Sequence, residues 1–169
     1  MTVSIYDISI PAFIRGLTNL SGLLDKAAAH AAAKKFDPGV LVHARLFPDM
    51  HALSRQVQIA CDTVKGAAAR LAGVDIPKHE DTEATLEDLK ARIAKTVEFL
   101  KTIKPEQLQG AESRPIEMKF PNRTMNFTGL SYLTGFVLPN LYFHVSIAYA
   151  LLRGNGVEIG KGDFLGPIQ

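Results

Sequence analysis

The 169-residue sequence contains a single cysteine, Cys61, and no tryptophan. One cysteine cannot form an intrachain disulfide, and it cannot supply the several thiolates of a cysteine-based zinc cluster. The sequence also lacks an excess of one charge, because 19 basic and 17 acidic residues leave a formal net charge of +2. Such a balance gives no electrostatic footprint for nucleic acid. We therefore exclude a disulfide scaffold and expect no nucleic-acid partner.

The first eleven residues lack the basic start and the apolar core of a secretory signal, so we expect a cytoplasmic protein. No charged residue lies between Arg123 and Arg153. An uncharged stretch of about 18 or more residues is a candidate membrane span. This stretch, however, contains Pro139, Asn140 and His144, and polar side chains are costly in lipid. We therefore expect a helix that is buried by protein, and no membrane association.

The length and composition indicate one globular unit. Hydrophobic residues make up 47% of the chain and charged residues 21%, which is ordinary for a globular protein. Domains usually contain about 100–200 residues. We therefore expect a single domain over residues 1–169.

Three stretches repeat apolar residues in alternating steps of three and four, which places one apolar stripe on a helix. The stripes are Phe13, Leu17, Leu20, Leu24, Ala27 and Ala31; then Met50, Leu53, Val57, Ala60, Val64, Ala67 and Leu71; then Leu86, Leu89, Ile93, Val97, Leu100 and Ile103. Pro48-Asp49 is predicted to open the second helix. Thr85 and Asp88 resemble a capping box at the start of the third.

The segments between and after these helices are less regular. Residues 40–47 (VLVHARLF) are predicted to form either a short strand or an extended connection. From Ile116 to Thr128 apolar and polar residues alternate around Pro121-Asn122, which predicts a β-hairpin. A fourth helix is predicted over residues 130–153, kinked or divided at Pro139. The glycine-rich tail, residues 157–169, is predicted to be irregular.

Four helices with apolar stripes indicate an all-α four-helix bundle, with a small β-hairpin between helices 3 and 4. The fourth helix has more apolar surface than one seam requires. Its large residues, Tyr132, Phe136, Leu141, Tyr142, Val145, Ile147 and Tyr149, spread around its circumference. Three neighbouring helices or a second subunit would cover them. We expect a symmetric homodimer.

Asn140 and His144 lie one turn apart and therefore on one face of this otherwise apolar helix. His144 is either a core histidine held by a hydrogen bond or a ligand of a metal or small molecule. Because the sequence has no HExxH motif, a third metal donor would come from Gln56, His51 or Asp62.

Cys61 lies beside the seam of the second helix. It is either a buried, inert thiol or a nucleophile, and no local base or cation supports the second interpretation.

Residues 140–144 (NLYFH), followed by residues 151–156 (LLRGNG), resemble the last helix of the DinB-like (YfiT-like) proteins. These are bacterial four-helix bundles, many of which bind a metal. The motifs at residues 48–60, 143–153 and 160–166 are similar to an uncharacterised branch of that group, and this similarity covers nearly the whole chain.

The resemblance implies a position for a metal site. In the wider superfamily, a His-x-x-x-His pair on helix four and one histidine on helix two hold nickel or zinc. Matching the closing Leu-Leu-Arg places His144 on the second histidine and Asn140 on the first, and a rougher match places Gln56 on the third. Neutral amides are weak ligands beside imidazole. The resemblance therefore implies either no cofactor or a divalent metal, nickel or zinc, held through His144.

The expected function is that of an uncharacterised, dimeric DinB-like bundle. Its degenerate metal site would act as a small-molecule pocket formed by Gln56, Asn140 and His144, with His51 and Asp62 as further candidates. The alternative is a metal-dependent small-molecule thiol transferase or hydrolase that uses His144. A third possibility is a partner that adds a strand to the exposed edge of the hairpin.

Overall fold

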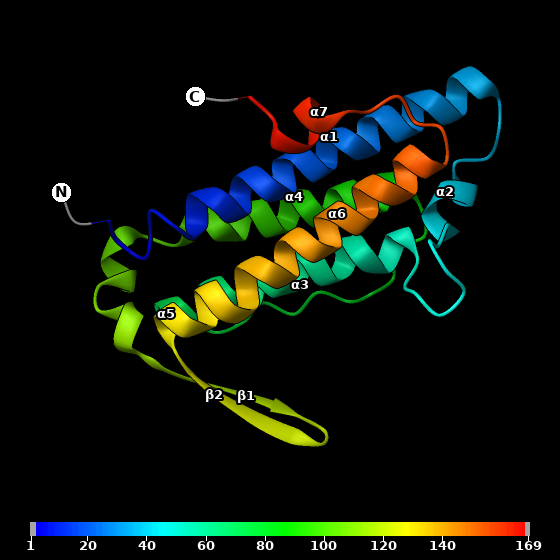
Figure 1. The fold of residues 1–169 in the computed structure, drawn as a ribbon. Coiled ribbons are helices and arrows are strands. Elements are labelled where there is room, and N and C mark those ends of the chain that lie inside the picture. The colour runs from blue at the N-terminus through cyan, green and yellow to red at the C-terminus, as the bar shows by residue number, and fades with distance from the viewer. Residues whose placement is uncertain (1–2, 168–169) are drawn as a thin grey trace.

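Four long helices lie side by side in the computed structural model, which describes residues 3–167 (Figure 1). They are α1 (Ile10–Lys34), α3 (Leu53–Ala72), α4 (Leu86–Thr102) and α6 (Leu138–Gly154). Helix α3 packs against α4 and α6, and α1 packs against the same two helices from the other side. This arrangement is the predicted four-helix bundle.

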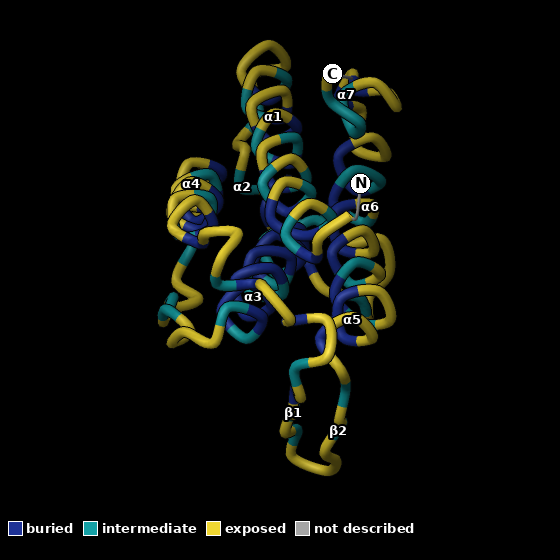
Figure 2. The backbone as a smooth tube through the Cα atoms, turned by 90° about the vertical axis from the view of Figure 1, so that its left-hand side faces the viewer, coloured by how far each residue is buried: buried dark blue, intermediate teal, exposed yellow. Residues whose placement is uncertain are grey.

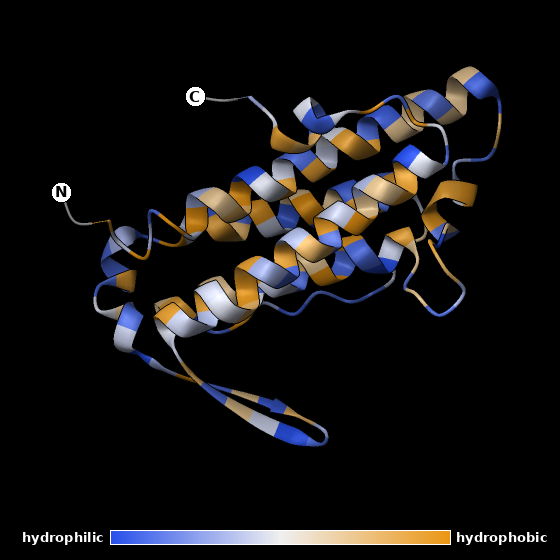
Figure 3. Cartoon of the chain, in the orientation of Figure 1, coloured by the Kyte–Doolittle hydropathy of each residue, from blue (hydrophilic) through white to orange (hydrophobic). Residues whose placement is uncertain are grey.

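The predicted apolar stripes form the core of the bundle. Every residue of the α1 stripe is buried, and so are the six α3 residues from Leu53 to Leu71. The buried side of each long helix faces its neighbours, and the exposed side faces solvent (Figure 2). Colouring by hydropathy shows the same division (Figure 3). Burial of apolar surface is therefore what fixes the rotation of each helix about its axis.

Two segments before α3 differ from the prediction. Residues 40–47 begin with a short helix, α2 (Gly39–His43), and contain no strand. Asp37 Oδ1 accepts a hydrogen bond from the Gly39 N–H, and Leu41 and Val42 turn into the core. Helix α3 begins at Leu53, later than the predicted Pro48-Asp49, because the intervening loop is closed by a hydrogen bond from the Leu53 N–H to the Ala44 carbonyl.

The hairpin is present as predicted. Two short 3₁₀ turns, Pro105–Leu108 and Ala111–Ser113, lead from α4 to β1 (Pro115–Phe120), which pairs in an antiparallel register with β2 (Arg123–Thr128). It projects away from the end of the bundle (Figure 1). Its base is held by Phe127, whose ring lies 5.6 Å from that of Tyr132 and 5.9 Å from that of Phe136.

One continuous helical segment follows the hairpin, from Gly129 to Gly154. It consists of α5 (Gly129–Tyr132), a π-helical turn (Leu133–Val137) and α6. Pro139 does not divide it, because Pro139 lies in the first turn of α6, directly after the π-helical turn. By length and composition alone this segment could cross a membrane, but core helices pass the same test, and α6 packs against α1 and α3.

The tail is more ordered than predicted over residues 157–167; residues 168 and 169 lie outside the described part of the chain. Residues Lys161–Leu165 form a short helix, α7, which lies along α1 (Figure 1). Arg15 donates two hydrogen bonds to the Leu165 carbonyl, and Asn19 donates one to the Phe164 carbonyl. An ion pair of 2.6 Å joins Lys26 to Asp163. The tail is ordered by polar side chains of α1, which periodicity does not reveal.

The capping box at the start of α4 gives a first prediction. Thr85 Oγ1 accepts a hydrogen bond from the Asp88 N–H, and Asp88 Oδ2 accepts one from the Thr85 N–H. We expect Thr85→Ala to lower the free energy of unfolding by about 1 kcal/mol, which corresponds to about 2–4 °C in Tm. Thermal unfolding followed by circular dichroism measures this.

The matched control is Thr102→Ala at the other end of the same helix, where the exposed hydroxyl bonds only to the Phe99 carbonyl. An equal loss of Tm in both variants would show that the capping box adds nothing.

Candidate functional site

The side chains of Gln56 and His144 meet between α3 and α6. Gln56 is 2% exposed and His144 is 8% exposed. Gln56 Oε1 lies 2.7 Å from His144 Nδ1. Two of the three predicted pocket residues, 88 positions apart in the chain, are therefore in direct contact.

The hydrogen bonds around Gln56 fix the protonation of the imidazole. Gln56 Nε2 donates a hydrogen bond of 3.0 Å to the carbonyl of His51. A carbonyl only accepts, so the amide nitrogen of Gln56 faces His51 and its oxygen faces His144. The oxygen also only accepts, so His144 Nδ1 carries the proton. In the neutral ring, the lone pair is then on Nε2.

The surroundings of His144 favour this neutral form. Burial is the main cause that lowers the pKa of His144, and the charges of His51 and Arg55 lower the pKa further. The Phe143 ring stands at 89° to the imidazole, with 5.2 Å between centroids. Phe143 is 54% exposed, so an aromatic surface lies beside the imidazole at the outside of the bundle.

The side chains of the remaining candidates form no hydrogen bond with this pair. Asn140 is half-buried, and its side-chain amide donates to the Phe136 carbonyl, 3.1 Å away within its own helix. His51 is exposed and contributes its backbone carbonyl. Asp62 faces α4, where its carboxylate lies 2.9 Å from Arg92. Asp62 therefore belongs to a different polar cluster.

That cluster is centred on Arg92, whose side chain is 1% exposed. Its guanidinium lies 2.9 Å from Asp62, 3.0 Å from Asp81 and 2.9 Å from Glu83, and it donates to the Glu80 carbonyl. Burial alone would lower the pKa of Arg92, but the hydrogen bond and charge of Glu83 and the charge of Asp62 raise it. Arg92 on α4 therefore holds the connection between α3 and α4 against both helices, through ion pairs to the connection and to Asp62 on α3.

Sequence reasoning missed Arg92. It lies beside the apolar stripe of α4, three residues after Leu89, and an arginine at that position is usually solvent-exposed. The sequence signal for a paired arginine was the group of three acidic residues in the preceding connection, Glu80, Asp81 and Glu83.

Cys61 has the environment of an unreactive thiol. Its thiol is buried, and burial raises its pKa to about 12. The thiolate that a nucleophile requires is therefore not formed near neutral pH, which favours the inert interpretation.

Comparison with known proteins identifies the family. Residues 5–165 match the family described as a domain of unknown function, DUF1993. The chain belongs to the DUF1993 family. Among proteins with curated descriptions, no sequence matches it.

The fold of this DUF1993 protein is also found in a solved structure. The crystal structure of a DinB family member protein from Shewanella denitrificans, at 1.83 Å resolution, is similar with a TM-score of 0.91 and 42% sequence identity. The alignment covers 97% of this chain and 93% of that chain. The predicted DinB-like fold, and membership of a branch of unknown function, are both confirmed.

The donor atoms of this DUF1993 protein do not fit the nickel or zinc site that the DinB resemblance implies. Gln56 Oε1 accepts the proton of His144 Nδ1, and the Asn140 amide is bonded to its own helix. Only Nε2 of His144 is left as a strong donor of the three. Over residues 3–167, no group of three His, Cys, Asp or Glu side chains is placed to hold a metal ion. These side chains therefore supply one strong donor where a nickel or zinc ion requires at least three.

The lowered pKa of His144 makes the stability of this DUF1993 protein depend on pH. Between the lowered pKa and the ordinary value of 6.5, the unfolded chain binds more protons than the folded one, so the free energy of unfolding falls as pH falls. Each pKa unit of difference contributes about 1.4 kcal/mol. We expect His144→Gln to lose less stability than wild type between pH 7 and 5, measured by urea unfolding.

Burial also lowers the pKa of His79, so part of the acid destabilisation persists in His144→Gln and is removed by adding His79→Gln. Identical pH profiles for wild type and His144→Gln would contradict the assigned environment of His144.

Proposed function

We propose that this protein is a metal-independent, small-molecule-binding bundle, and that its ligand donates a hydrogen bond to His144 at the Gln56–His144 site. One observation carries the proposal: the Gln56 amide, fixed by the His51 carbonyl, holds His144 as a neutral imidazole with its lone pair on Nε2. A lone pair at that atom accepts a hydrogen bond from a hydroxyl or N–H group.

The neighbouring side chains support a ligand that is partly apolar. Phe143 offers an exposed aromatic surface against the imidazole, and aromatic faces bind other rings and apolar groups. Asn140 lies one turn earlier on the helix and is half-buried. Its side-chain nitrogen donates to the Phe136 carbonyl, and its side-chain oxygen takes no part in that hydrogen bond. The ligand class is therefore a small molecule with one hydrogen-bond donor on an apolar or aromatic body.

Phenol is a minimal probe of this site, because it combines a hydroxyl donor with an aromatic ring. We expect phenol to shift the imidazole resonances of His144 saturably in NMR spectra, with a millimolar Kd. Anisole, which has the ring without the donor, is expected to bind at least about fivefold more weakly, since one hydrogen bond contributes about 1 kcal/mol.

His144→Gln is the matched variant. In wild type and variant alike, binding is also followed through the backbone amide resonance of Phe143, which lies beside residue 144, and the variant is expected to lose the preference for phenol over anisole. Equal shifts by both compounds in wild type would contradict the hydrogen-bonding role. Metal content is measured on the same protein, purified without a histidine tag. One equivalent of nickel or zinc, lost in His144→Gln, would contradict metal independence and favour the metal-dependent thiol transferase or hydrolase.

We also propose that the protein is a homodimer. The helical segment from Gly129 to Gly154 carries no charged residue before Arg153, and apart from Phe143 at the ligand site it exposes the large side chains of Leu130 and Tyr142. Large exposed apolar residues on an uncharged helix are typical of protein interfaces. A second copy with the same surface would cover them in a twofold arrangement.

A charge on this surface tests the dimer. We expect wild type to be dimeric by light scattering at micromolar concentration. Tyr142 is 45% exposed in the single chain. We expect Tyr142→Glu to be monomeric, because an unpaired carboxylate would be buried in the interface. Ala94→Glu on the exposed side of α4 is the control and is expected to remain dimeric. A monomeric wild type would refute the proposal.

A further inference from the structure

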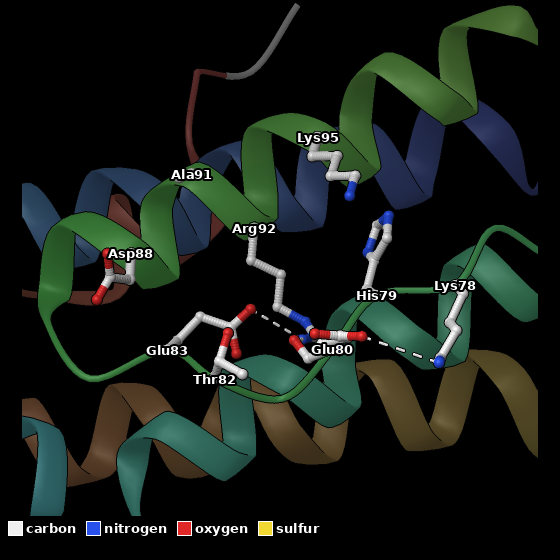
Figure 4. Close-up of a pocket in the computed structure, with 9 residues that line it drawn as sticks. All are labelled: Lys78, His79, Glu80, Thr82, Glu83, Asp88, Ala91, Arg92 and Lys95. Atoms are coloured by element: carbon white, nitrogen blue, oxygen red, sulfur yellow. Dashed lines mark hydrogen bonds and ion pairs between the residues drawn. The ribbon is translucent and has the colours of Figure 1, made fainter.

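A cavity lies apart from the His144 site, between α4 and the connection that joins α3 to α4. Its volume is about 550 Å³, and it is open to solvent. Its walls carry cations and carboxylates in similar number, among them Lys78, His79, Glu83, Arg92 and Lys95 (Figure 4). Composition alone therefore does not indicate which charge it would bind.

The pairing of these charges indicates the sign of the charge that the cavity would bind. Glu83 forms an ion pair with Arg92 and accepts a hydrogen bond from Gln58. Asp88 accepts a hydrogen bond within the capping box. Asp81, beside the cavity, is shared between Arg55 and Arg92. Glu80 lies 3.9 Å from Lys78. Most of the negative charge is thus committed to partners already present.

Two basic side chains lack such a partner. Lys95 forms no ion pair within residues 3–167. Neither ring nitrogen of His79 has a hydrogen-bond partner there, although both nitrogens are buried. Figure 4 shows the His79 ring and the end of Lys95 pointing toward one another. Arg92 Nε is likewise buried without a partner.

The charges that face His79 come from both helices. Burial is the main cause that lowers the pKa of His79, followed by the charges of Lys65 on α3 and of Lys95 and Arg92 on α4, while Asp62 opposes them. Lys65 and Arg92 are already paired with Asp62, so Lys95 is the cation left over. A neutral imidazole beside this lysine, with an N–H group that has no acceptor, is an incomplete arrangement. The missing group is a negatively charged acceptor.

We propose that the cavity at His79 and Lys95 binds a small molecule through an oxyanion, either a phosphate or a carboxylate. Its oxygens would accept hydrogen bonds from the His79 ring and the Lys95 ammonium, the charge-assisted kind that is strongest in proteins. Lys95 is exposed, so its side chain can move from above the His79 ring onto the bound anion. The cavity leaves room for the body of the molecule.

The experiment follows the His79 ring by NMR while inorganic phosphate or acetate is added at constant ionic strength with sodium chloride. We expect one of the two anions to shift the His79 resonances saturably, and to raise the pKa of His79 by about one unit, because a bound negative charge favours the imidazolium. The anion that saturates at the lower concentration identifies the source, phosphate or carboxylate.

Lys95→Gln is expected to weaken that binding by about tenfold, the loss of one charge-assisted hydrogen bond. The control is Lys101→Gln, on the same helix, whose lysine pairs with the exposed Glu98 and is away from the cavity. An equal loss in both variants, or no saturable shift of His79 with either anion up to tens of millimolar, would overturn the proposal. His144 serves as an internal reference, so failure at His79 is separable from failure of the phenol site.

Discussion

The Gln56 amide is the constraint on which the chemistry of the site depends. It is held at one end by the backbone carbonyl of His51, just before α3 begins, and at the other by the imidazole of His144 on α6. Because a carbonyl cannot donate, the orientation of the amide and the tautomer of the imidazole are fixed together. The bond also joins α3 to α6 at a position where the wider DinB superfamily is expected to join them through a metal ion.

Helix α3 carries the polar contacts of both proposed sites on opposite sides. Gln56 faces α6, while Gln58, two residues later and therefore nearly opposite, bonds to Glu83 in the connection before α4. One turn further, Asp62 reaches Arg92. The connection is thus held by ion pairs that require a buried arginine. Within residues 3–167, this leaves Lys95 without an ion pair and the His79 ring without a hydrogen-bond partner.

Much of the fold followed from periodicity, since the apolar stripes within α1, α3 and α4, the Thr85 capping box and the hairpin lie where they were predicted. Met50, the first residue of the second stripe, instead lies half-buried in the loop before α3. Two of the wrong predictions share a cause. The helix at Gly39–His43 and the ordered tail at Lys161–Leu165 are stabilised by Asp37, and by Arg15 and Asn19, respectively. Short helices of five residues have too few turns for a periodic signal, and their stability depends on partners that a local pattern does not contain.

The sequence by itself determined that the chain is a helical bundle, which face of each helix is buried, and that His144 and Asn140 share one turn of the last helix, because these properties depend only on residues close together in the chain. The tertiary structure decided that His144 meets Gln56 while Asn140 turns to Phe136, and that Asp62 faces Arg92 instead of His144. Hydrogen bonds and ion pairs depend on distances of about 3 Å between groups from different helices. Periodicity defines only a face of each helix, and packing then decides which side chains on facing helices touch.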